Sequence, residues 1–98
     1  MAHARRKFHE CRRLDAARME TALAWIGKLY GVEKDLRERC QDQWQSLPLD
    51  QRAGRIVQER QERSRPLLSD FHAWLEAEAT KVLPKNDVRG AMDYALNN

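Results

Sequence analysis

The sequence predicts an all-α protein. Apolar residues recur at steps of three and four along most of the chain, and strong helix formers dominate a composition with only 4 glycines and 3 prolines. With 42% hydrophobic residues and 3 tryptophans, the chain has enough apolar surface to fold rather than stay disordered. A chain of 98 residues forms one domain at most, so we expect residues 1–98 to make a single helical domain.

The first expected helix spans residues 2–12. Ala4, Phe8 and Cys11 fall on one side of it, and basic residues occupy the other positions. A helix of about three turns with so narrow an apolar face is marginal in water. It should therefore pack on something, within the chain or beyond it.

The second expected helix spans residues 16–44, with Asp15 as its N-cap. Gly27 and Gly31 lie four apart on one face, which predicts that another helix approaches there closely; a break near Gly31 is the alternative. The expected apolar stripe, interrupted only by Glu33, is Met19, Leu23, Ile26, Leu29 or Tyr30, Leu36 and Cys40.

A turn at residues 45–49 leads into a third expected helix, residues 50–82, with Asp50 in or before its first turn. Pro66 lacks a backbone donor and predicts a kink; two separate helices with Ser64 capping the second is the alternative. The expected apolar stripe of this helix is Leu67, Phe71, Trp74, Leu75, Ala79, Val82 and Leu83.

Pro84 should end the third helix, and Asn86 or Asp87 should cap a short fourth helix that ends near Leu96. Two long amphipathic helices joined by a short turn favour an antiparallel hairpin. The hairpin should be rod-like, since 28 helical residues span about 42 Å. The first and fourth helices should lie at the same end of the rod.

The residues show no catalytic pattern. There is no glycine-rich loop, the acidic residues are interspersed with arginines, and the potential metal ligands His3, His9, Cys11, Cys40 and His72 lack chelating spacing. We therefore expect no cofactor. Two cysteines in a helical chain fit a reducing cytosol, and no apolar run approaches the roughly 18 residues of a membrane span, which predicts a cytoplasmic protein without a membrane partner.

Basic residues gather in two places although the formal net charge is only +3. Such clusters can hold DNA phosphates, or they can be ordinary solvated helix faces. The candidates for DNA contact are Arg5, Arg6, Lys7, Arg12 and Arg13 in the first cluster and Arg60, Arg63 and Arg65 in the second.

Several blocks of the sequence resemble the insertion-sequence-66 family of transposases. The blocks are HARRKF at residues 3–8, LAWIGKLYGVE at 23–33, RQERSRPLL at 60–68 with AWL at 73–75, LPK at 83–85 and YALN at 94–97. They occur in the family's order and cover nearly the whole chain.

The resemblance implies a DDE-type transposase with an RNase H-like core and metal-dependent strand transfer. It also implies that the two catalytic aspartates lie upstream of HARRKF and the glutamate downstream of YALN. Asp15, Asp50 and Asp87 match none of them, so no catalytic residue is expected here. The chain resembles the helical segment between the second aspartate and the glutamate, as a fragment or a truncated gene product. Divalent metal is expected only in the missing core.

The expected function is therefore a non-catalytic transposase region that scaffolds the core, contacts transposon DNA or mediates self-association. The alternative is a stand-alone interaction module that dimerises without binding DNA. Phe8, Val88, Met92 and Leu96 would need cover in the absence of the core, which predicts a homo-oligomer.

Overall fold

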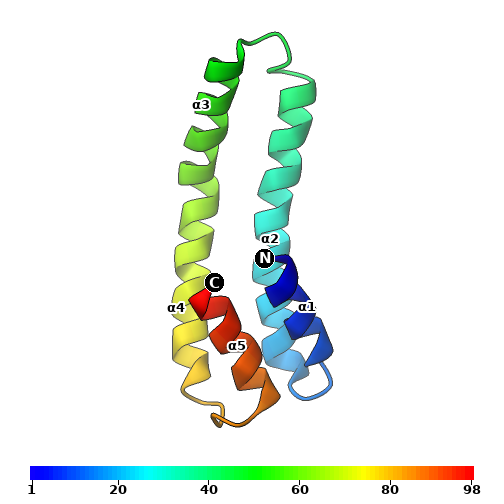
Figure 1. Ribbon diagram of the computed structural model, residues 1–98, viewed down its shortest axis with the longest axis vertical. Coiled ribbons are helices and arrows are strands. Elements are labelled where there is room, and N and C mark those ends of the chain that lie inside the picture. The colour runs from blue at the N-terminus through cyan, green and yellow to red at the C-terminus, as the bar shows by residue number, and fades with distance from the viewer.

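The computed structural model describes all 98 residues, and they form helices without any strand. The elements are α1 (Ala2–Glu10), α2 (Ala16–Gln41), α3 (Leu49–Glu59), a π-helical segment η1 (Arg60–Ser64), α4 (Arg65–Ala79) and α5 (Asp87–Asn97). The molecule measures 51 × 21 × 17 Å. Figure 1 shows α2 running antiparallel to the continuous rod of α3, η1 and α4, with α1 and α5 at one end. The all-α fold, the hairpin and the placement of the short helices are confirmed.

Both long helices end about three residues earlier than the sequence predicts. Beyond Gln41 the backbone N–H of Trp44 donates to the carbonyl of Arg39 at 2.8 Å, which turns the indole inward. Beyond Ala79 the N–H of Val82 donates to the carbonyl of Ala79, three residues back, at 3.2 Å. The first bond spans five residues and widens the last turn, the second spans three and tightens it, and each ending delivers one apolar side chain to the interior.

The main core lies where α1, α2, α4 and α5 meet. Phe71 of α4 is at its centre, with its ring centroid 6.4 Å from that of Phe8 on α1 and 6.2 Å from that of Trp25 on α2. Met19 and Met92 are fully buried in the same cluster. The short helices thus cover one face of the hairpin at this end.

This packing overturns one expectation. Phe8, Val88 and Met92 are at most 1% exposed, because α1 and α5 pack against each other and against the hairpin. Leu96 is partly buried against the same core. These side chains need no cover from a second molecule, so the reason given for a homo-oligomer does not hold.

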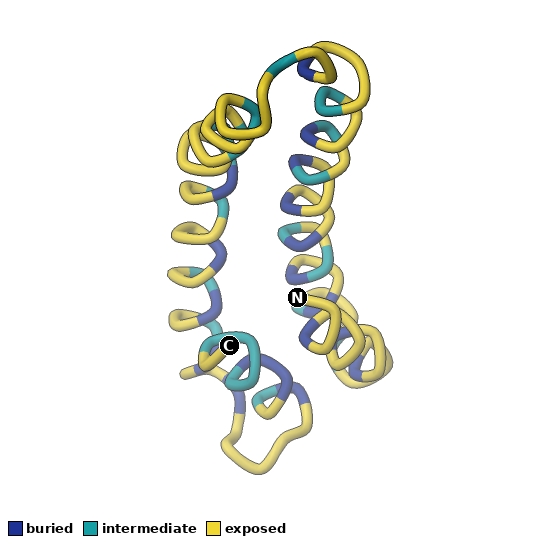
Figure 2. The backbone as a smooth tube through the Cα atoms, turned by 45° about the horizontal axis from the view of Figure 1, so that its top comes forward, coloured by how far each residue is buried: buried dark blue, intermediate teal, exposed yellow.

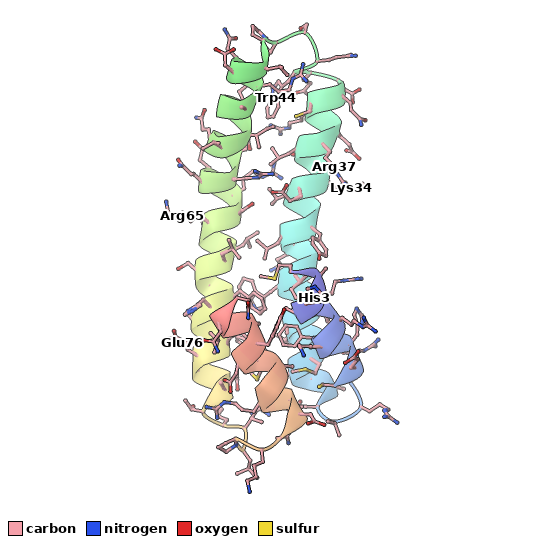
Figure 3. The ribbon with its side chains drawn as sticks, in the orientation of Figure 1. His3, Lys34, Arg37, Trp44, Arg65 and Glu76 are labelled. Carbon is pink, nitrogen blue, oxygen red and sulfur yellow. The ribbon has the colours of Figure 1, made fainter.

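A smaller cluster of Val32, Leu36 and Trp44 closes the far end of the hairpin. Arg52 holds the connecting turn, donating to the carbonyls of Trp44, Gln45 and Leu47 at 3.2, 2.7 and 3.3 Å. Trp44 lies between the two helix ends (Figure 3). Figure 2 shows buried positions along α2 almost to this tip, whereas α3 has no fully buried residue. Here the molecule is only two helices thick.

The stripe expected along α2 is wrong at its middle. Val32 is buried, whereas Tyr30 is 41% exposed and Glu33 is partly exposed, because the stripe steps from Leu29 to Val32 and on to Leu36. The helix does not break at Gly31.

Two further expectations about packing are wrong. No heavy atom would lie within 4 Å of a Cβ added at Gly27 or Gly31, so neither glycine admits a neighbouring helix. Leu83 is 76% exposed, because α4 has already ended and Val82 takes the core position instead.

The irregularity expected at Pro66 is a π turn just before the proline. The backbone N–H of Arg65 donates to the carbonyl of Arg60, five residues back. A widened turn here accommodates the ring and the missing donor of Pro66 without breaking the helix. Ser64 makes no capping bond, so the alternative of two capped helices is wrong. Its hydroxyl is buried and has no hydrogen-bond partner.

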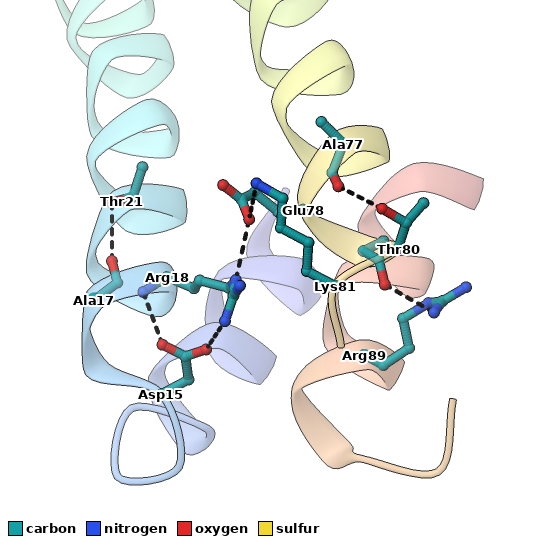
Figure 4. Close-up of polar contacts among 10 residues, drawn as sticks. Asp15, Ala17, Arg18, Thr21, Ala77, Glu78, Thr80, Lys81 and Arg89 are labelled. Atoms are coloured by element: carbon teal, nitrogen blue, oxygen red, sulfur yellow. Dashed lines mark hydrogen bonds and ion pairs between the residues drawn. The ribbon is translucent and has the colours of Figure 1, made fainter. Parts of the chain in front are cut away.

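Polar contacts fix the four-helix end (Figure 4). Asp15 caps α2 as predicted, accepting from the backbone N–H of Arg18 at 3.1 Å. The Arg18 guanidinium reaches Asp15 at 2.7 Å and Glu78 of α4 at 3.3 Å. On α5, Arg89 donates to the carbonyls of Ala79 and Val82 at 2.8 and 3.0 Å and so closes the end of α4.

The two ends of the chain lie side by side. Met1 and Asn98 line one small hollow of about 60 Å³, together with residues of α1 and α5. Figure 1 shows both ends beside the hairpin, well short of its tip. The tip therefore projects beyond the point where the chain enters and leaves.

Candidate nucleic-acid interface

The first basic cluster lies on the exposed side of α1 and in the turn that follows it. Ala4 and Phe8 direct one face of α1 into the core, so the intervening positions face solvent. All five predicted residues are exposed: Arg5, Arg6, Lys7, Arg12 and Arg13. The structure therefore leaves each of these five side chains accessible to solvent.

The five side chains of this cluster differ in their partners. Arg6 pairs with Glu10 at 3.3 Å and Arg12 with Glu20 at 3.5 Å, and all four side chains are more than half exposed. Such surface pairs are weak and readily exchanged for another anion.

The other three residues of the cluster have no carboxylate partner. Arg5 lies over the ring of Tyr30 at 5.9 Å and Lys7 over that of Tyr94 at 4.9 Å, whereas Arg13 has neither kind of contact. A cation over an aromatic face keeps its charge and its outward donors. Arg5, Lys7 and Arg13 are therefore the residues best able to accept a phosphate.

The second cluster lies elsewhere, along η1 and the first turn of α4. Arg60 donates two hydrogen bonds to the Glu33 carboxylate, at 2.9 and 2.8 Å. Arg63 pairs with Asp35 and, at 3.5 Å, with Glu59. These two arginines link α2 to η1, which is a structural use of their charge.

The pKa values follow from these contacts. Hydrogen bonds from Arg60 hold the pKa of the Glu33 carboxyl below its usual value, and those from Arg63 do the same for Asp35. The guanidinium pKa of each arginine is raised in turn by the same bond. Both pairs are thus fully ionised at neutral pH.

Arg65 is the one member of the second cluster without an ion pair. Figure 3 shows it directed away from the hairpin on one side, with Lys34 and Arg37 on the other. The spacing of the sequence did not single out Lys34 or Arg37, because each stands next to an acidic residue along the chain. Arg65 and the Tyr30 ring under Arg5 border the same hollow, so the fold brings these two parts of the clusters together.

The acidic residues do not assemble into a metal site. No three His, Cys, Asp or Glu side chains are grouped so that they could hold an ion. Asp15 caps α2, while Asp50 and Asp87 lie in the first turns of α3 and α5, each near the positive end of a helix. Each of these three carboxylates therefore lies at the start of a helix.

The match to a family model covers residues 1–98, which is the whole chain, and the model is described as Transposase IS66 family. The chain belongs to the IS66 transposase family. Searches among curated proteins and among solved structures gave no match. The resemblance noted from the sequence blocks is confirmed over the full length.

As an IS66-family chain, the molecule has a function related to transposition. Its signature blocks now have places in the fold: HARRKF forms most of α1, and RQERSRPLL spans η1 and the start of α4. Within HARRKF, Ala4 and Phe8 are buried in the core, whereas the basic residues between them are exposed. The second block holds the hairpin together through Arg60 and Arg63. No helix of this IS66-family chain is both long enough and apolar enough to span a membrane.

Proposed function

We propose that this chain is a non-catalytic helical region of an IS66-family transposase and that it contacts transposon DNA through α1. The observation that carries the proposal is a set of exposed cations without an acidic partner, Arg5 and Lys7 on α1 and Arg13 in the turn after it, beside a helix face that is locked into the core. Cations held on a rigid helix bind phosphates with little loss of conformational freedom.

The hairpin supplies the scaffold in this proposal. The ion pairs between α2 and the opposite rod, together with the four-helix core, fix the direction of α1 relative to a molecule 51 Å long. The RNase H-like core expected elsewhere in the transposase would hold the catalytic carboxylates and the divalent metal. This chain would act in the bacterial cytoplasm, where the chromosomal DNA lies.

A gel-shift titration with duplex DNA across a range of salt concentrations tests the DNA contact. The triple variant Arg5→Ala, Lys7→Ala, Arg13→Ala should lose affinity about tenfold or more and show a shallower salt dependence, since each phosphate contact releases counterions. The matched control removes the same charge elsewhere, with Lys28→Ala, Arg55→Ala and Lys81→Ala. Equal losses in both variants, or no binding at low salt, would refute the contact.

Catalysis by this chain alone is tested by adding Mg²⁺ or Mn²⁺ to the chain and a transposon-end duplex. We expect neither cleavage nor strand transfer, because no three His, Cys, Asp or Glu side chains are grouped so that they could hold a catalytic metal ion. Metal-dependent cleavage by the purified chain would disprove the non-catalytic assignment.

The second candidate function is protein–protein interaction. Exposed apolar side chains on one face of the hairpin favour it, among them Tyr30, Val57 and Leu68. The expected self-association of the chain is measured by light scattering, where a concentration-dependent mass above 11.5 kDa would support it.

A further inference from the structure

A groove runs along one face of the hairpin between α2 and the α3–η1 segment. Its larger part has a volume of about 430 Å³ and is lined by Leu29 and Tyr30 on one side and by Val57 and Leu68 on the other. Tyr30, Val57 and Leu68 are 41%, 53% and 44% exposed, which is unusual for large apolar side chains that are neighbours in space.

The groove continues toward the hairpin tip. An adjoining hollow of about 230 Å³ is lined by Leu36, Cys40 and Ile56 and shares Glu33 and Arg60 with the larger part. The Arg60–Glu33 pair crosses the groove where the two parts meet. The two parts therefore follow each other along one face of the hairpin, divided by this ion pair, and both have apolar side chains in their lining.

The end of the groove that lies away from the hairpin tip adjoins the stretch of the hairpin on which α1 and α5 pack. Met1, just before α1, is part of its lining, and α1 and α5 pack on the neighbouring stretch of the hairpin. In Figure 2 the buried positions of α2 continue past the short helices toward the tip. The hairpin thus carries helices on part of this face and leaves the rest uncovered.

The charges around the groove are positive. Arg37 and Arg65 belong to its lining and form no ion pair, whereas the only acidic residue there, Glu33, is occupied by Arg60. Figure 3 places Arg65 on one side of the hairpin and Arg37 on the other. Any element that fills the groove lies between two unpaired guanidinium groups.

We infer that this groove binds an amphipathic helix of a partner protein, apolar on its inner face and acidic on its flanks. The apolar floor matches helix anchors at i, i+3 or i+4, and i+7, and carboxylates beside them would reach Arg37 and Arg65. DNA fits the groove less well, since a phosphate backbone offers no apolar surface to cover Tyr30, Val57 and Leu68. The π turn at η1, a feature that often marks functional sites, forms part of the wall.

The test uses three synthetic helical peptides of about 15 residues that share or lack these features. The first has leucine anchors and glutamate flanks, the second has the same anchors with lysine flanks, and the third has glutamate flanks with serine in place of leucine. Fluorescence anisotropy with the full chain should show binding of the first peptide at least about tenfold tighter than of either other peptide.

Two variants map the site. Val57→Asp should abolish binding of the acidic amphipathic peptide, and Arg65→Glu should weaken it about tenfold while improving binding of the lysine-flanked peptide. Leu83→Asp is the control, because Leu83 is 76% exposed and lies far from the groove. Circular dichroism verifies that each variant is folded. The double variant Lys7→Ala, Arg13→Ala should bind the peptide normally, because neither residue lines the groove, and this result separates the site from the proposed DNA contact.

Four outcomes would overturn the inference. They are equal binding of the acidic and basic peptides, binding unaffected by Val57→Asp, displacement of the bound peptide by a DNA duplex, and a wild-type dimer in light scattering that Val57→Asp converts to monomer. The third would make the groove a nucleic-acid site and the fourth an interface between copies of this chain.

Discussion

Arg60 and Glu33, 27 residues apart in the chain, share two hydrogen bonds of 2.9 and 2.8 Å that join the π segment to α2. A two-point contact fixes the relative rotation of the helices as well as their distance. It lies where the helical rod changes from α to π geometry and back. The two helices are therefore registered at the one place where the backbone of the rod is irregular.

Removing either partner of this pair should have a small, coupled effect. Both side chains are about half exposed, so solvent screening limits the coupling free energy to about 0.5–1 kcal/mol. A double-mutant cycle of Arg60→Ala and Glu33→Gln, followed by urea unfolding, measures it. The same cycle on the more exposed pair Arg6 and Glu10 is the control and should give less. Additive losses at Arg60 and Glu33 would mean that the contact contributes nothing.

The stability of the fold should decrease in acid. Bonds from arginines lower the pKa values of Asp15, Glu33 and Asp35 in the folded state. Their contribution is complete above the unfolded-state values of about 4 and is lost as the pH falls through the lower folded values. The free energy of unfolding should thus be flat from about pH 7 to pH 5 and decline below.

A triple variant, Asp15→Asn, Glu33→Gln and Asp35→Asn, tests this dependence. It keeps the size of each side chain, and asparagine still caps α2. Thermal unfolding between neutral and acidic pH should show a smaller decline for the variant than for the natural chain. An unchanged slope would assign the acid sensitivity to other carboxylates.

Truncation of Phe8 should be among the most damaging single changes. The side chain is fully buried against Phe71, so Phe8→Ala should cost about 3–5 kcal/mol through lost apolar contact and a cavity. It should also release α1 from the hairpin. Urea unfolding gives the free energy, with Leu83→Ala, at a 76% exposed position, as a control expected within about 0.5 kcal/mol of the natural chain. A loss below about 1 kcal/mol at Phe8 would contradict the packing of α1.

Replacing Ser64 by alanine should stabilise the chain. The Ser64 hydroxyl is buried without a hydrogen-bond partner, which costs free energy, and alanine is also the better helix former. The expected gain in the free energy of unfolding is up to about 1 kcal/mol. Ser69→Ala, at an exposed position five residues beyond the π segment, is the control for helix propensity alone. Destabilisation by Ser64→Ala would reveal a hydrogen bond in solution.

The two cysteines should react at different rates. Cys11 is 8% exposed, and burial, followed by the charges of Asp87 and Glu10, raises the pKa of its thiol, whereas Cys40 is partly exposed. A thiol reagent should therefore label Cys40 first and Cys11 only as the protein opens. Single variants Cys11→Ser and Cys40→Ser identify which site is labelled. Equal rates would show that α1 opens freely.

Much of this fold follows from the local pattern of the sequence. The spacing of Phe71, Leu75 and Ala79 gave the inner face of α4, and Asp15 and Asn86 gave the starts of two helices, because caps and stripes depend on neighbours within one turn. The phase of α2 was misjudged at Val32, since Tyr30 is apolar enough to satisfy the same period. Only the position of the partner helix decides which of Tyr30 and Val32 is buried.

The candidate site was predictable only in part. Exposure of the α1 arginines followed from its narrow apolar face, but the pairing of Arg60 with Glu33 and of Arg63 with Asp35 depends on helix register across the hairpin. A basic run next to glutamates gives no indication of whether its partners lie on the same helix or on another. The groove could not be predicted from the sequence either, because its lining residues come from separate helices that meet only in the fold.

The adjacency of Met1 and Asn98 has a topological consequence. A chain that leaves where it enters can be spliced into a single surface loop of a host domain without pulling the two halves of that host apart. The ends can also be moved: a short glycine linker from Asn98 to Met1, with a new opening at the exposed Ser46 in the far turn, creates a circular permutant with the same helices. The permuted molecule would have both chain termini at the hairpin tip. The four-helix end would then be the part that projects away from the termini.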